Sequence, residues 1–159
     1  MSTSMPSRPR QVGQRRTFAI VASEYNGEFV QGLIEHARRE FEAISPSFNI
    51  ILHEVPGAFE IPLVVQEVAT RGGIDAIIAL GVIIEGETAH ASLIAGAITR
   101  ALLEISLAQR VPVIHEVLLV ASAAQARARC LGEEINRGTE AARTAARVVQ
   151  ALSHFRSGR

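Results

Sequence analysis

Apolar residues alternate along the chain between short continuous runs and longer stretches in which they recur every three or four positions. The run Thr17–Ser23 leads into the turn residues Tyr25-Asn26-Gly27, and apolar residues then repeat at helical spacing from Phe29 to Ile44. A short buried run predicts a strand, whereas the repeat predicts an amphipathic helix. Applied to the whole chain, these criteria predict strands at 17–23, 48–55, 76–84 and 111–120, and helices at 29–44, 61–70, 90–109 and 136–153, with a further helix capped by Ser122.

The alternation of strands and helices decides the expected fold class. Repeated strand–helix units favour a parallel sheet covered by helices on both faces. We therefore expect an α/β protein, a three-layer α/β/α sandwich of the flavodoxin-like class with a four-stranded parallel sheet. Residues 17–155 would form its single domain. Residues 1–16 contain Ser, Pro and Arg without an apolar segment, so we expect a flexible tail, with an organellar presequence as the alternative.

Ligands in folds of this class bind beyond the carboxyl ends of the strands. That rule selects residues 23–27, 55–60, 81–90 and 115–119. Within them, the loop from Glu85 to His90 joins a buried strand to a helix N-terminus, where free N–H groups and the helix dipole attract an anion. Gly86 would let the backbone approach that anion, and Thr88 would add a hydroxyl donor. The alternative is structural, with Gly86 as a turn residue, Thr88 as the helix N-cap and His90 as a surface residue instead of a proton-transfer group.

Composition removes several kinds of chemistry. The sequence has 16 cationic residues, all of them Arg, which balance 16 acidic residues. Without Lys there is no Schiff-base lysine, lysine general base or P-loop lysine. Asp75 is the only Asp and Cys130 the only Cys, which argues against Asp-rich metal loops, aspartyl dyads, disulfides and CxxC zinc sites. We expect neither a metal nor another cofactor.

Nucleic acids and membranes are not expected partners. Arg residues cluster at both ends, but Glu residues are interspersed, and only seven aromatic residues (one Tyr and six Phe) are present to stack on bases. Apolar runs such as residues 76–84 are too short to span a bilayer. We therefore expect a cytoplasmic location.

Two motifs point to a family. The sequence VPGAFEIP at residues 55–62 ends one predicted strand, and GVIIEGETAH at residues 81–90 ends the next. With Tyr25-Asn26 after the first strand and NRGTEAA at residues 136–142, they resemble 6,7-dimethyl-8-ribityllumazine synthase. The resemblance runs in order from about Phe18 to Val149. It favours the anion-binding hypothesis for the loop over the structural alternative.

The resemblance implies the penultimate step of riboflavin synthesis. Members of this family condense 5-amino-6-(D-ribitylamino)uracil with 3,4-dihydroxy-2-butanone 4-phosphate and release two waters and phosphate. The intermediate imine joins the two substrates, so the reaction does not need an enzyme lysine. The alternative is a catalytically weak homologue that binds a flavin or lumazine, or that only forms a shell.

The resemblance also implies roles for individual residues. Tyr25 would stack on the pyrimidine ring, and His90 would transfer protons with support from Glu140. Arg129 would bind the phosphate of the butanone substrate through its two-pronged guanidinium. The other expected substrate-binding residues are Asn26, Ala58, Phe59, Glu60, Val82, Ile83, Ile84, Gly86, Glu87, Thr88, His115 and Arg137.

The chain departs from the family pattern at several positions. Glu85 replaces the usual Arg before the GET motif, and a carboxylate pointing into the site would weaken anion binding. Arg137 replaces the usual Lys near the pyrimidine, and His115 replaces the usual Phe at a wall supplied by a neighbouring subunit. Leu119 replaces a Thr, and Ala91-Ser92 replace an aromatic–acidic pair.

Assembly is implied as well. Family members form pentamers whose active sites span two subunits, and some members pack twelve pentamers into a hollow icosahedral shell. The apolar helix expected from Ala91 to Leu107 would pack at the pentamer centre, or would only cover the sheet. The short spacing between Arg129 and Asn136 is compatible with a shell. We therefore expect a homopentamer, and the sequence leaves the choice between pentamer and shell open.

Overall fold

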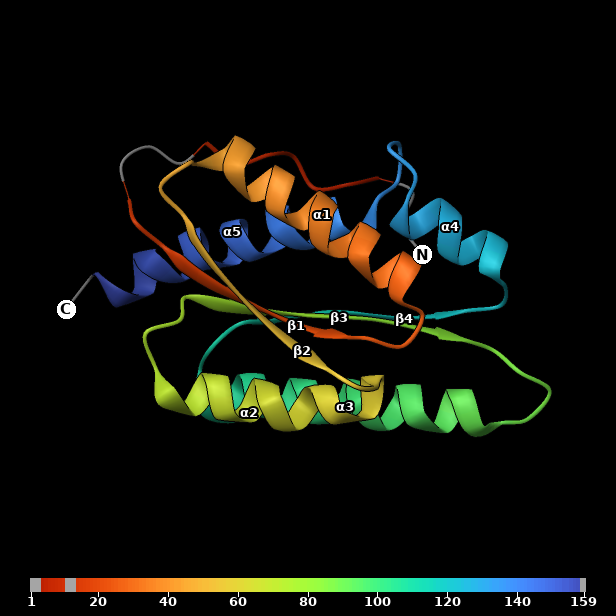
Figure 1. The fold of residues 1–159 in the computed structure, drawn as a ribbon. Helices are drawn as coiled ribbons and strands as arrows, with labels where there is room; N and C mark the ends of the chain where they lie inside the picture. The colour runs from red at the N-terminus through yellow and green to blue at the C-terminus, as the bar shows by residue number, and fades with distance from the viewer. Residues whose placement is uncertain (1–3, 11–13, 158–159) are drawn as a thin grey trace.

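Four parallel strands form the central layer of the molecule, in the order β2-β1-β3-β4. The computed structural model describes residues 4–10 and 14–157. Helices α1, α4 and α5 cover one face of the sheet, and α2 and α3 cover the other (Figure 1). This arrangement confirms the expected three-layer α/β sandwich. The strands are β1 (Thr17–Ser23), β2 (Asn49–Val55), β3 (Ala76–Ile84) and β4 (Val113–Val120), and the helices are α1 (Gly27–Ile44), the 3-10 turn η1 (Ala58–Glu60), α2 (Ile61–Arg71), α3 (His90–Gln109), α4 (Ala123–Cys130) and α5 (Arg137–Arg156).

Most element boundaries agree with the sequence-based predictions, and local chemistry explains the differences. β4 begins at residue 113 instead of 111, because Pro112 has no N–H to donate to a strand ladder. The Ser122 hydroxyl accepts a hydrogen bond from the Gln125 N–H at 3.2 Å and caps α4 as predicted. Asn136, which we expected inside the last helix, is its N-cap. α5 continues to Arg156, beyond the predicted end at residue 153.

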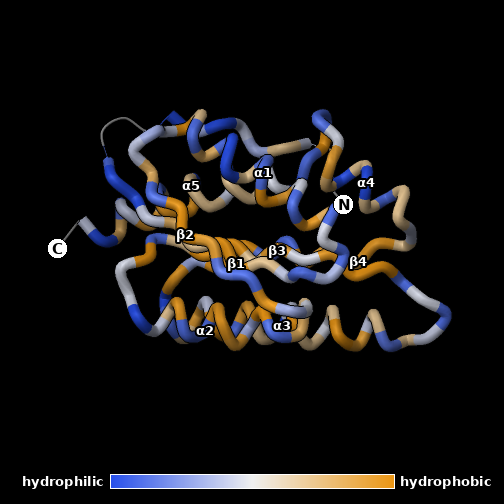
Figure 2. Tube along the Cα trace, viewed as in Figure 1, coloured by the Kyte–Doolittle hydropathy of each residue, from blue (hydrophilic) through white to orange (hydrophobic). Residues whose placement is uncertain are grey.

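Two apolar cores lie on the two faces of the sheet. The central strands β1 and β3 contribute to both, because their side chains alternate between the faces. On the side of α1 and α5, the rings of Phe18 and Phe41 stack with their centroids 4.5 Å apart. Hydrophobic residues are concentrated along the strands (Figure 2). The buried strands therefore hold the loops at their carboxyl ends in fixed positions.

Ion pairs connect the segments before β1 to the rest of the fold. The carboxylate of Glu40, which is buried on α1, accepts hydrogen bonds from Arg8 at 2.7 and 2.9 Å and from Arg143 of α5 at 2.8 Å. Arg16 donates to Asp75 at 3.1 Å, at the start of β3. Part of the predicted tail thus contacts the domain, while residues 1–3 and 11–13 lie outside the described residues. The division into a flexible tail and one domain stays a prediction.

Helix α3 has an apolar surface that the chain only partly covers. Ile98, Leu102 and Ile105 are buried against the fold, whereas Leu93 and Leu107 are each 71% exposed. Within the described residues, α3 is also the single helix long and apolar enough to cross a membrane by length and composition. The sequence analysis looked only for uninterrupted apolar runs and did not single out α3 as a candidate span, because polar residues interrupt its apolar sequence. Both observations describe a helix with an apolar face that is left without a partner in one chain.

Candidate active site

A cleft of about 500 Å³ lies at the carboxyl ends of β1 and β3, beside η1 and α3. Parallel α/β folds usually bind their ligands in a crevice at the carboxyl ends of the strands, and this cleft has that position. Eight of the predicted substrate-binding residues line it, namely Tyr25, Asn26, Ala58, Phe59, Glu60, Val82, Ile83 and Ile84. Ser23 and Gly57 also line the cleft; they lie in the predicted strand-end segments but were given no individual role, and Ile94 was not predicted. A groove of about 570 Å³ between the C-terminal ends of α3 and α5 contains none of the predicted residues.

The turn after β1 is joined to the neighbouring strands by hydrogen bonds. Asn26 has a left-handed backbone with φ of 56°, which turns the chain from β1 into α1. Its side-chain Nδ2 donates to the Val82 carbonyl at 2.7 Å and so links this turn to β3. The Tyr25 N–H donates to the Pro56 carbonyl at 3.2 Å, which links the turn to the loop after β2. Three sequence-distant segments are therefore held together around the cleft.

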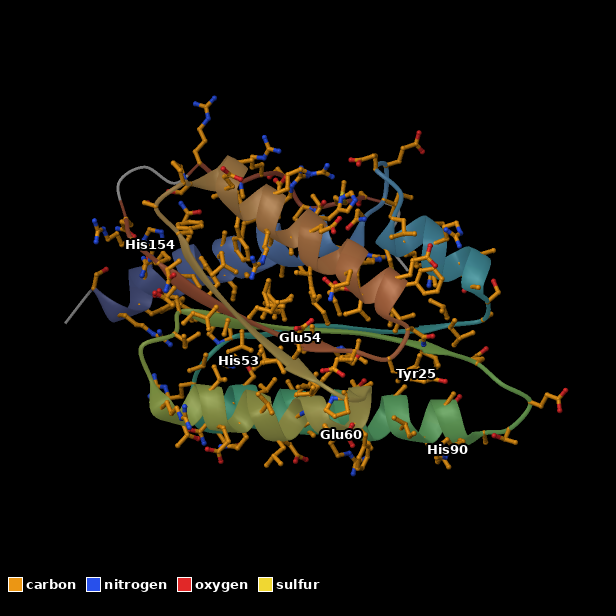
Figure 3. All side chains as sticks on the ribbon, viewed as in Figure 1. Tyr25, His53, Glu54, Glu60, His90 and His154 are labelled. Atoms are coloured by element: carbon orange, nitrogen blue, oxygen red, sulfur yellow. The ribbon has the colours of Figure 1, made fainter. Side chains whose placement is uncertain are left out.

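Two aromatic side chains stand exposed at the cleft. Tyr25 is 73% exposed and Phe59 is 61% exposed, although aromatic side chains are usually buried at least in part. Figure 3 places Tyr25, Glu60 and His90 at the same end of the sheet, and His154 at the opposite end. An exposed aromatic ring beside an open cleft offers a face on which a flat ring can stack.

The loop after β3 leads into α3 without a side-chain cap. The N-cap residue is Ala89, which has no polar side chain, so the alternative that made Thr88 the N-cap is wrong. Gly86 has open space around it, and Glu85, Glu87, Thr88 and His90 are all exposed. An uncapped helix N-terminus leaves first-turn N–H groups free to bind an anion. Residues 85–90 do not line the cleft, but they follow directly on Ile84, which does, so the geometry suits a phosphate group beside the cleft.

Four other predicted residues lie elsewhere in the chain, and none of them lines the cleft. His115 is on β4, Arg129 is on α4, and Arg137 and Glu140 are in the first turn of α5. Arg137 is 6% exposed and forms an ion pair with Glu140. A single chain therefore presents the predicted site in two parts, one around the cleft and one on β4, α4 and α5.

The ring of His115 is fixed by hydrogen bonds on both nitrogens. Nδ1 accepts from the Val117 N–H at 3.1 Å, so the neutral ring carries its proton on Nε2, which lies 2.7 Å from Thr99 Oγ1. The Thr99 hydroxyl in turn donates to the Ala95 carbonyl at 2.8 Å. Burial lowers the pKa of His115, which favours this neutral form. His115 thus connects β4 to α3.

Glu116 is an acidic residue in the predicted segment 115–119 to which our sequence-based predictions gave no role. It pairs in register with Leu80 of β3 and faces the side of the sheet covered by α5. Burial is the main cause that raises the pKa of Glu116 to about 8; nearby Glu140 adds to this shift, and Arg137 opposes it. The available signal was that Glu116 is the one acidic residue of β4. Arg137 and Glu140, which were predicted separately as site residues, therefore belong with Glu116 to a group of two carboxyls and one guanidinium.

We expect Glu116 to make folding stability fall as the pH rises from about 5 to about 8. The folded state keeps the proton to a pH of about 8, whereas the unfolded chain loses it near 4.5, so deprotonation favours unfolding across this interval. Glu116→Gln should remove this slope and stabilise the protein at pH 8 by about 2 kcal/mol, a discounted value because the side chain is not fully buried. Thermal unfolding at a series of pH values measures the slope. Glu42→Gln, at an exposed position on α1, is the control, and equal slopes in all three proteins would contradict the assignment.

Comparisons with known proteins identify the family of this chain. The sequence model of the family described as 6,7-dimethyl-8-ribityllumazine synthase matches residues 15–153. A protein of that name from Cytophaga hutchinsonii is 39% identical over 135 residues, which cover 84% of this chain and 85% of the relative. Another from Methylobacterium radiotolerans is 35% identical over 157 residues, which cover 99% and 93%. The chain therefore belongs to the 6,7-dimethyl-8-ribityllumazine synthase family of transferases, which places it in riboflavin biosynthesis.

Proposed function

We propose that the cleft beside Tyr25 binds 5-amino-6-(D-ribitylamino)uracil and that the adjoining end of α3 binds 3,4-dihydroxy-2-butanone 4-phosphate. The observation that carries this proposal is the position of an exposed aromatic ring and an uncapped helix N-terminus at the same edge of the sheet. A flat pyrimidine stacks on the first, and a phosphate accepts hydrogen bonds from the second. Residues 58–60 and 82–84 would border the ribityl chain and the ring, respectively.

The proposed reaction proceeds without a covalent bond to the enzyme. The amine of the pyrimidine attacks the ketone of the butanone, and loss of water gives an imine between the two substrates. Phosphate leaves by elimination, and attack of the ribitylamino nitrogen on the newly formed carbonyl closes the ring with loss of a second water. The enzyme holds both substrates in reacting geometry, stabilises the departing phosphate at residues 86–88 and moves protons through His90.

A second copy of the chain would complete the site. His115, Arg129, Arg137 and Glu140 are implied in binding or catalysis but lie away from the cleft in a single chain. A homo-oligomer in which these residues face the cleft of a neighbour would bring the two parts together. The exposed leucines of α3 provide an apolar surface for such contacts. We therefore propose a homopentamer in the cytoplasm, with α3 at the subunit contacts.

The assay that tests the function mixes the purified chain with both substrates and follows the fluorescence of the lumazine product. We expect product to form, and we expect His90→Ala to reduce kcat by about tenfold, because positioning of the two substrates supplies much of the acceleration. His154→Ala, at the opposite end of the sheet, is the control and should not change kcat.

Two outcomes would contradict the proposal. A wild-type protein that forms no product but binds riboflavin tightly would indicate a flavin-binding homologue. Equal kcat values for His90→Ala and the wild type would exclude His90 as a proton-transfer group.

A further inference from the structure

Ser23, the last residue of β1, has a buried hydroxyl beside the cleft. It is 3% exposed and lines the cleft, and its Oγ has no hydrogen-bond partner within residues 4–10 and 14–157. Ser45, the other buried Ser among the described residues, does have a partner, because its hydroxyl lies 2.8 Å from that of Ser47. A buried hydroxyl without a partner destabilises the folded state, and a ligand in the adjoining cleft would supply the missing partner.

The strand directs Ser23 toward the cleft side of the sheet. Ala22 packs into the core under α1 and α5, and the alternation along β1 turns Ser23 toward the layer of α2 and α3. Gly81 of β3 lies next to it. A Cβ at residue 81 would be 3.1 Å from Ser23 Oγ and 3.2 and 3.3 Å from side-chain carbons of Val117 and Ile61. Because Gly81 lacks that atom, no side chain of residue 81 lies against the hydroxyl.

Unlike the Ser23 hydroxyl, the other polar side chains of the cleft are exposed or already have a hydrogen-bond partner. The Asn26 amide nitrogen already donates to the Val82 carbonyl. Glu60 is exposed, and its Oε2 is 2.7 Å from the point where a Cβ on Gly57 would be, so its carboxylate lies over Gly57. In the described lining of the cleft, Ser23 is therefore the buried side chain with a hydrogen bond still to make.

From these observations we infer that the Ser23 hydroxyl binds the edge of the heterocyclic substrate. The inference rests on the proposed function and adds a residue that selects the substrate. Tyr25 contacts the face of a flat ring, which any aromatic ring offers, whereas a hydroxyl distinguishes a ring carbonyl or ring N–H from a C–H. A ring with such a polar edge satisfies the buried hydroxyl, and a ring without it leaves that group unpaired.

The test is Ser23→Ala in the full chain, with both Michaelis constants, the Kd for 5-amino-6-(D-ribitylamino)uracil by calorimetry, and the melting temperature. We expect the KM and Kd for the pyrimidine to rise about tenfold, which corresponds to one lost hydrogen bond. The KM for the butanone phosphate should stay within about twofold, because its phosphate is bound at α3. The melting temperature should not fall, since the substitution removes an unpaired polar group.

Ser45→Ala is the matched control, because it also deletes a buried hydroxyl. The Ser45 hydroxyl has a hydrogen-bond partner, Ser47, and both residues lie at the opposite end of the sheet from Ser23. It should lower the melting temperature and leave both Michaelis constants unchanged. A Ser23→Ala protein that behaves like Ser45→Ala, or whose Kd for the pyrimidine stays within about twofold of the wild type, would overturn the inference. A wild-type protein that binds the pyrimidine but forms no lumazine would contradict the proposed function alone. In that case the ratio of the Kd of Ser23→Ala to the Kd of the wild type, both for the pyrimidine, still decides the role of Ser23.

Discussion

Arg129→Ala is expected to raise the KM for 3,4-dihydroxy-2-butanone 4-phosphate by about tenfold to a hundredfold. The guanidinium of Arg129 lies at the C-terminal end of α4, and within the described residues it makes no ion pair or hydrogen bond. A free, permanently charged fork suits a phosphate, and a hydrogen bond between two charged groups is worth about 1.5–3 kcal/mol. Steady-state kinetics with the second substrate saturating measure the effect, and the KM for the pyrimidine should change little.

Arg127→Ala is the control for this prediction, because it removes the same side chain from the same helix. Arg127 donates to Glu28 at 2.9 Å and lies over the ring of Phe29, so its guanidinium is already engaged within the chain. Its loss should leave both Michaelis constants unchanged. Arg129→Lys should recover only part of the affinity, because an ammonium cannot reproduce the two-pronged contact. Equal Michaelis constants for Arg129→Ala and Arg127→Ala would remove Arg129 from the phosphate site.

Gly138→Ala is expected to lower the free energy of unfolding by about 3 kcal/mol, because a Cβ at this residue collides with the backbone of α1. It would lie 2.2 Å from the Leu33 carbonyl oxygen and 2.9 Å from the carbonyl carbon. The helices α1 and α5 pack directly on each other, so neither backbone can move without disturbing the core. Urea denaturation measures the loss. Arg137 and Glu140 flank Gly138, so the same shift should also lower activity.

Gly27→Ala tests whether this loss comes from the collision. Gly27 also lies in the first turn of a helix, but a Cβ there would have no heavy atom within 4 Å. The expected change is within about 0.5 kcal/mol of the wild type, or a small gain from the stiffer unfolded chain. If both variants denature at the same urea concentration, the close approach of α1 and α5 does not control stability.

Local sequence patterns predicted the elements well and the details of the site less well. The bounds of β1, β3 and α3 agree with the predictions because a buried strand and a long helix each impose a period on many residues. The N-cap of α3 was predicted less well, because Thr88 and Ala89 are adjacent and only the backbone angles decide which of them begins the helix. Motif resemblance selected the residues of the cleft, and periodicity alone would not have done so.

Two residues to which the sequence-based predictions gave no role share one property. Ser23 and Glu116 lie in strand-end segments that the sequence selected, but what each side chain contacts depends on residues from other segments. The hydroxyl of Ser23 lies beside the bare backbone of Gly81, and the carboxyl of Glu116 lies near Glu140 of α5. These neighbours are distant in the sequence, so no local pattern contains them.

The sequence by itself determined the succession of strands and helices, the parallel sheet and the family, because each depends on periodicity or on short motifs within one segment. It also determined that lysine chemistry is absent. The tertiary structure decided which side chains meet. It joined the ends of β1 and β3 and the turn η1 into one cleft and placed Arg129, Arg137 and Glu140 away from it. It also left the Ser23 hydroxyl without a hydrogen-bond partner among the described residues. Such positions depend on how separate segments pack, and packing is a property of the whole chain.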